Sequence, residues 1–232
     1  MPDSTHKAAG EGLSCGTAWV PAPARPPTLH EDEVHVWRAE LEQLRERSGL
    51  LCREEHKRVE RFLDPHAATL WKRGRGLLRE LIAGYVGQPP ESLSLRTGPN
   101  GKPALEQPAA LSFNLSHSGA LAVYAFSSFG EVGVDVQLPR RQLDELALAA
   151  RAFGPAHAER LALLEPPARA RAFLQAWVRH EATVKWHGGG IASAAADERR
   201  PWVAELDPGL GAAAALAVDR RPQALLCWAV GS

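Results

Sequence analysis

The sequence predicts an α+β fold built from two halves of similar design. Apolar runs typical of buried strands and longer helical segments follow one another in blocks: a strand, helices, strands, then helices and strands again. The chain has 232 residues, of which 45% are hydrophobic and 23% charged, so it is long enough to bury a sizeable core and ordinary in composition. No visible sequence repeat accompanies the two blocks.

The first half is predicted to begin with a strand over residues 34–37, where side chains alternate in polarity. A charged amphipathic helix over residues 51–63 follows, and then a helix over residues 65–85 whose first residue is a proline, as helix N-termini tolerate. Gly74 and Gly76 lie inside this second helix, where each costs about 1 kcal/mol relative to Ala. Two explanations remain open: close helix packing, or close approach of a ligand beside the neighbouring basic residues.

Strands dominate the next segment of the chain. The cluster Gly98-Pro99-Asn100-Gly101 predicts a turn. Runs rich in β-branched and aromatic residues predict strands before and after it, and we place them at residues 92–96, 111–114, 121–126 and 132–138.

The second half begins with an Ala- and Leu-rich helical region over residues 141–186. Two Gly-Pro or Pro-Pro pairs, at 154–155 and 166–167, interrupt it, and the triple glycine at 188–190 ends it. Three further apolar runs predict the last strands, at residues 202–206, 213–218 and 224–230.

Bulk properties exclude several classes of function. Lys plus Arg and Asp plus Glu both total 27, so a general basic surface for nucleic acid is not expected. No apolar run approaches the roughly 18–20 residues that cross a bilayer, and no membrane association is expected. Cys15, Cys52 and Cys227 are isolated, which favours a reducing cytoplasm. Residues 1–28 are polar and then proline-rich, and we expect a disordered or extended lead-in rather than a signal peptide.

One carboxylate stands inside a strand. Asp135 lies between Val134 and Val136, and an unpaired buried carboxylate costs several kcal/mol, so it needs a metal ion or a cationic group as partner. His117 comes at the end of the preceding apolar region. It is either a functional residue or a structural histidine hydrogen-bonded at a strand end.

A second carboxylate lies on the buried face of a helix. At about 100° per residue, Glu181 and Lys185 share the arc of the apolar residues around Trp177. Two inward carboxylates with no thiolate cluster and many cations indicate a magnesium site that also uses phosphate oxygens. Zinc is not favoured, since no second His or Cys has a usable spacing.

From about residue 34 onward, the chain resembles the 4′-phosphopantetheinyl transferases of the surfactin-synthetase-activating (Sfp) type. Four motifs in this order carry the resemblance: Gly101-Lys102-Pro103, residues 113–118 (Phe-Asn-Leu-Ser-His-Ser), Gly133-Val134-Asp135, and residues 177–185 with Glu181-Ala182. Leu77-Leu78-Arg79 is also typical of this family.

The resemblance implies a Mg²⁺-dependent holo-[carrier protein] synthase. Such an enzyme transfers the 4′-phosphopantetheine arm of coenzyme A to a serine of an apo acyl, peptidyl or polyketide carrier protein and releases adenosine 3′,5′-bisphosphate. It also implies a monomer with two pseudo-symmetric α/β halves and the active site in the cleft between them. We expect residues 29–130 to form the N-terminal half and residues 131–232 the C-terminal half.

The family's functional residues map onto this chain residue by residue. Asp135 and Glu181 match the magnesium ligands, with Gln137 as a third candidate. The matches to coenzyme A contacts are Arg58, Arg96, Lys102, Asn114, Ser116, His117 and Lys185. We assign catalysis to Asp135, Lys185 and Glu181, with Glu181 taking the serine proton directly or through a water.

Two positions depart from the family pattern. Gln137 replaces an acid that often stands two residues after the Asp, and His180 replaces a Lys that commonly precedes the Glu. Both changes are expected to affect metal or coenzyme A affinity more than the type of reaction. Rival hypotheses are a coenzyme A-binding protein without turnover and an adaptor that acts through its N-terminal segment. The carrier partner is expected to present an acidic helix beside its serine.

Overall fold

A computed structural model describes residues 18–98, 101–106, 110–140, 143–188 and 199–231. Most of the predicted strands are present with small shifts. The strands are β1 (Val20–Pro21), β2 (Glu33–Glu40), β3 (Leu95–Thr97), β4 (Pro103–Leu105), β5 (Ser112–Ser118), β6 (Leu121–Ser127), β7 (Val132–Gln137), β8 (Trp202–Leu206), β9 (Ala213–Val218) and β10 (Ala224–Val230). The helices are α1 (Arg53–Val59), α2 (Pro65–Val86), α3 (Glu145–Phe153), α4 (Pro155–Ala162) and α5 (Pro166–His187), with three short 3₁₀ turns at residues 41–43, 48–50 and 90–92.

Local chemistry explains where the long helices begin and end. The Asp64 side chain caps α2 by accepting from the His66 backbone N–H, with Pro65 in the first turn. Gly188, in the left-handed conformation, ends α5. The helix predicted at 51–63 is shorter than expected, because α1 ends at Val59 and the chain then turns into the cap of α2.

The strands form a five-stranded sheet, a three-stranded sheet and a small hairpin. The five-stranded order is β1-β10-β2-β6-β5, the three-stranded order is β7-β9-β8, and β3 pairs with β4. β10 comes from the C-terminal end of the chain, yet it pairs in parallel with β2. The division at residue 130 stays a prediction, but the last strand plainly joins the two parts of the chain.

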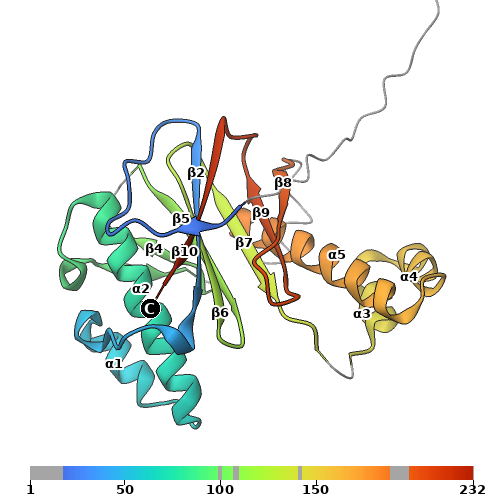
Figure 1. Cartoon of the computed structure of the whole chain (residues 1–232), viewed down its shortest axis with the longest axis horizontal. Coiled ribbons are helices and arrows are strands. Elements are labelled where there is room, and N and C mark those ends of the chain that lie inside the picture. The colour runs from blue at the N-terminus through green and yellow to red at the C-terminus, as the bar shows by residue number, and fades with distance from the viewer. Residues whose placement is uncertain (1–17, 99–100, 107–109, 141–142, 189–198, 232) are drawn as a thin grey trace, which may run out of the picture.

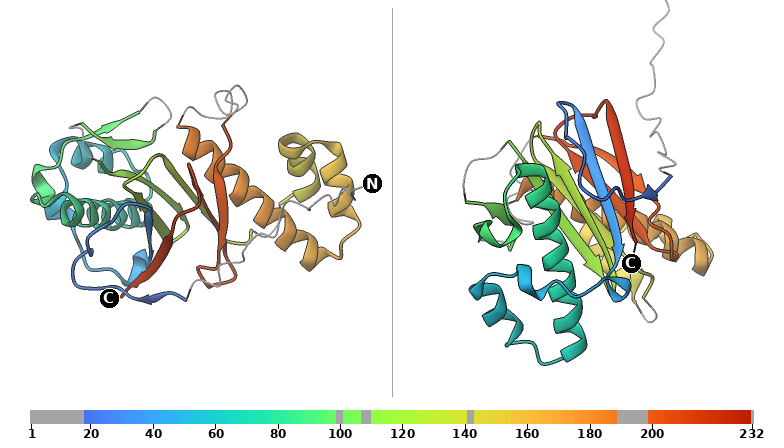
Figure 2. Two further views of the ribbon diagram at one scale, coloured as in Figure 1. Left: turned by 90° about the horizontal axis from the view of Figure 1, so that it is seen from above. Right: turned by 60° about the vertical axis from the view of Figure 1, so that its left-hand side comes forward.

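The two main sheets pack between two long helices, α2 on one side and α5 on the other (Figures 1 and 2). Along β6, alternate side chains enter two different cores: Tyr124 and Phe126 pack against α2, whereas Val123 packs against the three-stranded sheet. All seven residues of β6 are buried, which explains its continuous apolar character. The predicted mixed helix-and-strand architecture is therefore confirmed.

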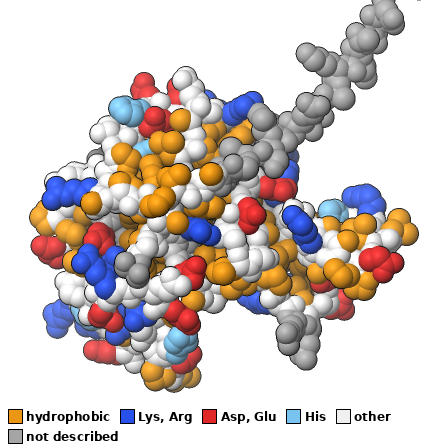
Figure 3. Space-filling view, viewed as in Figure 1, with side chains coloured by type: hydrophobic (Ala, Val, Ile, Leu, Met, Phe, Trp, Pro, Cys, Tyr) orange, Lys and Arg blue, Asp and Glu red, His pale blue; other side chains and the backbone are white. Residues whose placement is uncertain are grey.

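Helices α3 and α4 and the first turns of α5 form a lobe at one end of the molecule (Figure 1). The lobe has its own small core, which includes Leu161 and Phe173. Hydrophobic side chains also gather on its surface (Figure 3), where Leu163 and Leu164 are exposed. Within the described part of the chain, no helix is both long and apolar enough to span a membrane.

The glycines of α2 are explained mainly by packing. A Cβ at Gly76 would overlap the Arg47 side chain, and one at Gly74 would lie 3.4 Å from the Tyr124 Oη. Close helix packing is therefore the reason for Gly76, whereas Gly74 both packs against Tyr124 and lines the cavity described below.

One buried histidine makes the fold sensitive to acid. His35 is fully buried, and its Nδ1 lies 2.8 Å from the Tyr85 Oη. Burial lowers the pKa of His35 from 6.5 to about 4, against the opposing effect of Glu33 and with a small contribution from His30. The unfolded chain therefore binds the proton more tightly than the folded chain does between these two pH values.

We expect the free energy of unfolding to be unaffected by His35 above pH 6.5 and to fall by up to about 3 kcal/mol as the pH drops from 6.5 to 4. Urea unfolding across this range measures it. The His35→Asn variant should lose this part of the pH dependence, whereas His56→Gln, on the exposed face of α1, should keep it. An equally steep loss in His35→Asn would contradict the assignment.

Candidate functional site

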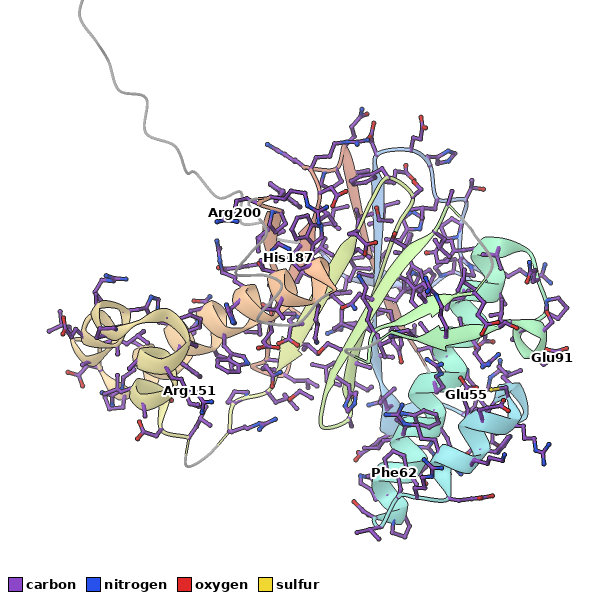
Figure 4. The ribbon with its side chains drawn as sticks, turned by 180° about the vertical axis from the view of Figure 1, so that it is seen from behind. Glu55, Phe62, Glu91, Arg151, His187 and Arg200 are labelled. Atoms are coloured by element: carbon purple, nitrogen blue, oxygen red, sulfur yellow. The ribbon has the colours of Figure 1, made fainter. Side chains whose placement is uncertain are left out.

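A cavity of about 950 Å³ lies beside the five-stranded sheet and is lined by elements from both predicted halves. Its size is that of a typical small-molecule site. Its walls come from α1 and α2, from the turn before β4, from β5 and β6, and from the last turns of α5. Figure 4 shows Phe62 on the α1–α2 side and His187 at the end of α5 on the other.

The polar centre of the site is a cluster around the carboxylate of Asp135, which is 1% exposed. The Lys185 Nζ donates to Asp135 Oδ1 at 2.6 Å, and the Ser116 Oγ donates to the same oxygen at 2.7 Å. Gln137 Nε2 donates to Asp135 Oδ2 at 3.2 Å. The partner that the sequence required for a buried Asp135 is therefore present, and in this structure it is the cationic group Lys185.

Helix α5 can reach Asp135 because Gly133 has no side chain. A Cβ at Gly133 would overlap the Ala182 carbonyl oxygen and the Trp186 backbone nitrogen, and it would lie 2.9 Å from the Trp186 Cα. The backbone of α5 thus rests on β7 at this point. The contact explains why the Gly133-Val134-Asp135 motif and the Glu181–Lys185 pair belong together.

Glu181 and Lys185 both line the cavity, as expected for two residues one helical turn apart on the same face. Glu181 is half-buried, and no described residue forms a hydrogen bond or ion pair with its carboxylate. It is therefore available to accept a proton or to bind a cation.

Most cations in the cavity already have carboxylate partners. Lys102 donates to Glu131 at 2.7 Å and to the Val132 carbonyl, and Arg75 pairs with the buried Glu55 of α1. Arg58 differs: its guanidinium lies 5.3 Å from the centre of the Trp71 ring, and among the described residues no carboxylate pairs with it. Three further carboxylates line the cavity: Glu42, Asp64 and Glu181. The cavity thus holds little uncompensated positive charge.

His117 lines the cavity on β5. Partial burial lowers the pKa of its imidazole below the usual value, and the charge of Lys185 lowers it further. The ring is therefore neutral near pH 7 and can serve as a hydrogen-bond partner rather than as a cation.

The structure brings together most of the residues that the sequence singled out. Arg58, Lys102, Asn114, His117, Glu181 and Lys185 line the cavity, and Ser116, Asp135 and Gln137 join it through the hydrogen bonds described above. Arg96 is exposed on β3 and does not line it. His180 lies against Phe153 in the lobe, with ring centres 5.5 Å apart, and does not line the cavity either.

Sequence reasoning did not assign Phe62 and Trp71, which belong to the apolar part of the cavity wall. Phe62 and Trp71 lie on either side of the α1–α2 turn, with ring centres 6.0 Å apart. The only signal for them was two aromatic residues close to Arg58 in the sequence. The bend that makes them neighbours is a tertiary feature.

Comparison with known proteins gives consistent matches. Residues 35–128 match a family model described as 4′-phosphopantetheinyl transferase, N-terminal, and residues 131–216 match the 4′-phosphopantetheinyl transferase superfamily. The chain is 36% identical over 181 residues to the 4′-phosphopantetheinyl transferase HetI of Nostoc sp., which covers 75% of this chain and 76% of that protein.

Two other relatives match shorter segments. The 4′-phosphopantetheinyl transferase psf-1 of Bacillus pumilus is 33% identical over 155 residues, covering 66% of this chain and 64% of its own length. The 4′-phosphopantetheinyl transferase AcpT of Salmonella typhimurium is 39% identical over 121 residues, covering 51% of this chain and 58% of its own. The chain thus spans less than two thirds of these two relatives.

We expect Gly133→Ala to lower the free energy of unfolding by about 2 kcal/mol, because the new methyl group must push α5 off β7. Urea unfolding at pH 7 measures the change. Gly49→Ala is the matched control, since nothing lies within 4 Å of a Cβ at Gly49. Equal stability of Gly133→Ala and wild type would show that the helix does not depend on this contact.

Proposed function

This chain belongs to the 4′-phosphopantetheinyl transferase family, whose members transfer a phosphopantetheine arm to carrier proteins, and we propose that it does so in the cavity between α2 and α5 with coenzyme A as donor and Mg²⁺ as cofactor. The observation that carries the proposal is that Glu181 and Lys185 line one cavity large enough for a nucleotide donor, while Lys185 also bonds to the buried Asp135. Adenosine 3′,5′-bisphosphate is the second product.

The residues present suit magnesium better than other metals. Within the described residues, no group of three or more His, Cys, Asp or Glu side chains is placed to hold a metal. Mg²⁺ does not need such a group, because it binds through one or two carboxylates together with waters and substrate phosphates. Asp135 and Glu181 would supply the carboxylates, and Gln137 lies next to Asp135. Few of the cavity's cations are unpaired, whereas a bound diphosphate needs positive charge around it. A divalent cation such as Mg²⁺ would supply that charge.

The reaction makes a bond between the carrier serine Oγ and the β-phosphorus of coenzyme A. The bond from that phosphorus to the oxygen of the adenosine bisphosphate breaks, and the serine proton goes to a base. A bound Mg²⁺ would neutralise part of the negative charge on the diphosphate oxygens. We assign Lys185 the role of holding a phosphate oxygen, and Glu181 the role of general base, directly or through a water.

A basic groove beside the cavity supports the proposal that the carrier presents an acidic helix. This second hollow, of about 800 Å³, is lined by Glu54, Lys57, Arg58, Arg61, Phe62 and Leu63. Leu63 is fully exposed and three of the six side chains are cationic, so the groove is complementary to an acidic, amphipathic helix. A monomeric state and a cytoplasmic location are part of the proposal, and the free thiol of Cys52 is consistent with a reducing compartment.

We expect Glu181→Gln to lower the rate of transfer by about 100-fold or more, because the base is lost while the shape is kept. Asp135→Ala should abolish transfer. The measurement is the intact mass of an apo carrier incubated with coenzyme A, Mg²⁺ and the protein, where transfer adds one phosphopantetheine arm.

Glu205→Gln is the control for Glu181→Gln, because Glu205 pairs with Arg179 of the same helix outside the cavity. Full activity in Glu181→Gln would remove Glu181 from the mechanism. Tight coenzyme A binding by the wild type without any mass gain would instead indicate a binding protein without turnover.

The metal assignment is tested by Gln137→Glu. A third carboxylate beside Asp135 should lower the Mg²⁺ concentration required for half-maximal transfer by about 10-fold. Gln137→Ala provides the comparison, as it removes the amide without adding charge. An unchanged Mg²⁺ requirement in Gln137→Glu would mean that residue 137 does not face the ion.

A further inference from the structure

Strand β5 reaches across to β7 through its side chains. The two strands belong to different sheets, yet Asn114, Ser116 and Ser118, which alternate along β5 and so share one face, all bond to β7 or to the residue that follows it. Asn114 Oδ1 accepts from the Val134 backbone N–H at 2.9 Å, and Ser118 Oγ accepts from the Leu138 backbone N–H at 3.0 Å. Ser116 bonds to the Asp135 carboxylate itself.

These bonds bracket Asp135. One anchors the residue immediately before it, and the other anchors the residue that follows Gln137. Asn114 and Ser118 are both buried, at 3% and 6% exposure, so water does not readily replace either oxygen as a partner for these N–H groups. The side-chain bonds take the place of the backbone bonds that neighbouring strands of one sheet would form.

We propose that Asn114 and Ser118 are positioning residues that fix β7 relative to β5 and thereby set where the Asp135 carboxylate stands with respect to Lys185 and Glu181. The inference rests on the proposed role of Asp135 in metal binding. It gives the alternating polar residues of β5 a second task besides contact with the donor. Ser118 is the cleaner test of the two, since it does not line the cavity, whereas Asn114 does.

The chain offers a matched control for a merely structural effect. Ser127 of β6 is fully buried, and its Oγ accepts from the Phe129 backbone N–H at 3.3 Å. Ser127→Ala therefore removes the same kind of bond as Ser118→Ala, from a strand that does not hold β7 through that bond.

The experiment measures binding of Mn²⁺, as a probe for Mg²⁺, in the presence of a fixed concentration of coenzyme A, by the electron paramagnetic resonance signal of the free ion, with coenzyme A in the absence of protein as the background. We expect Ser118→Ala to weaken Mn²⁺ binding by about 10-fold or more, as loss of outer supports of a metal ligand usually does. Hydrogen exchange of the segment 132–138 should become faster in the same variant. Ser127→Ala should leave Mn²⁺ affinity within about twofold of the wild type.

Asn114→Ala, which removes the bond at Val134, should also weaken Mn²⁺ binding and serves if Ser118→Ala does not fold. Mn²⁺ affinity within twofold of wild type in the folded variant, or an equal loss in Ser127→Ala, would overturn the inference alone, provided that Asp135→Ala abolishes binding. If Asp135→Ala binds Mn²⁺ as tightly as the wild type, the metal role of Asp135 is wrong and the inference falls with it.

Discussion

The backbone of α5 lies directly on β7 at Gly133, and the arrangement of the site follows from this contact. A helix held off by even one methyl group would carry Lys185 and Glu181 away from Asp135, because both side chains project from the turns that flank Ala182 and Trp186. The hydrogen bonds among Lys185, Ser116 and Asp135, all between 2.6 and 2.8 Å, leave little room for such a shift. Packing and chemistry therefore depend on the same glycine.

A second constraint joins the last strand of the chain to the N-terminal strand β2. β10 pairs with β2 along seven residues, so the last strand is part of the sheet that carries β5 and β6. Side chains of β5 then bond to β7, the first strand of the other sheet, and to Leu138 directly after it. The cavity thus lies between parts that are tied together by backbone pairing on one side and by buried polar side chains on the other, which suits a site whose groups come from separate elements.

Much of this could be predicted from local pattern. The strands β7 to β10 and the ends of α2 and α5 follow from apolar runs, Pro65 and Gly188, which are local signals. The need for a partner at Asp135 and the shared face of Glu181 and Lys185 are also local. The insertion of β10 beside β2 could not be predicted, because pairing between distant strands leaves no mark on either run. The same holds for the partner of Gly133, the contact between Phe62 and Trp71, and the choice of Lys185 as the group that meets Asp135.

The charges of the cavity indicate how the proposed reaction uses it. Lys102, Arg75 and Lys185 are each paired with a carboxylate, so a polyanionic donor must exchange partners at these three cations. Only Arg58, among the described cations that line the cavity, meets the donor without giving up a carboxylate. Exchange of the carboxylate partner of Lys185 has the widest effect, because it also changes what Asp135 can bind. When its ammonium turns to a phosphate oxygen, Asp135 Oδ1 keeps the Ser116 hydroxyl and becomes free for another cation. Donor binding and metal binding at this site should therefore favour each other, and by linkage each must strengthen the other by the same factor.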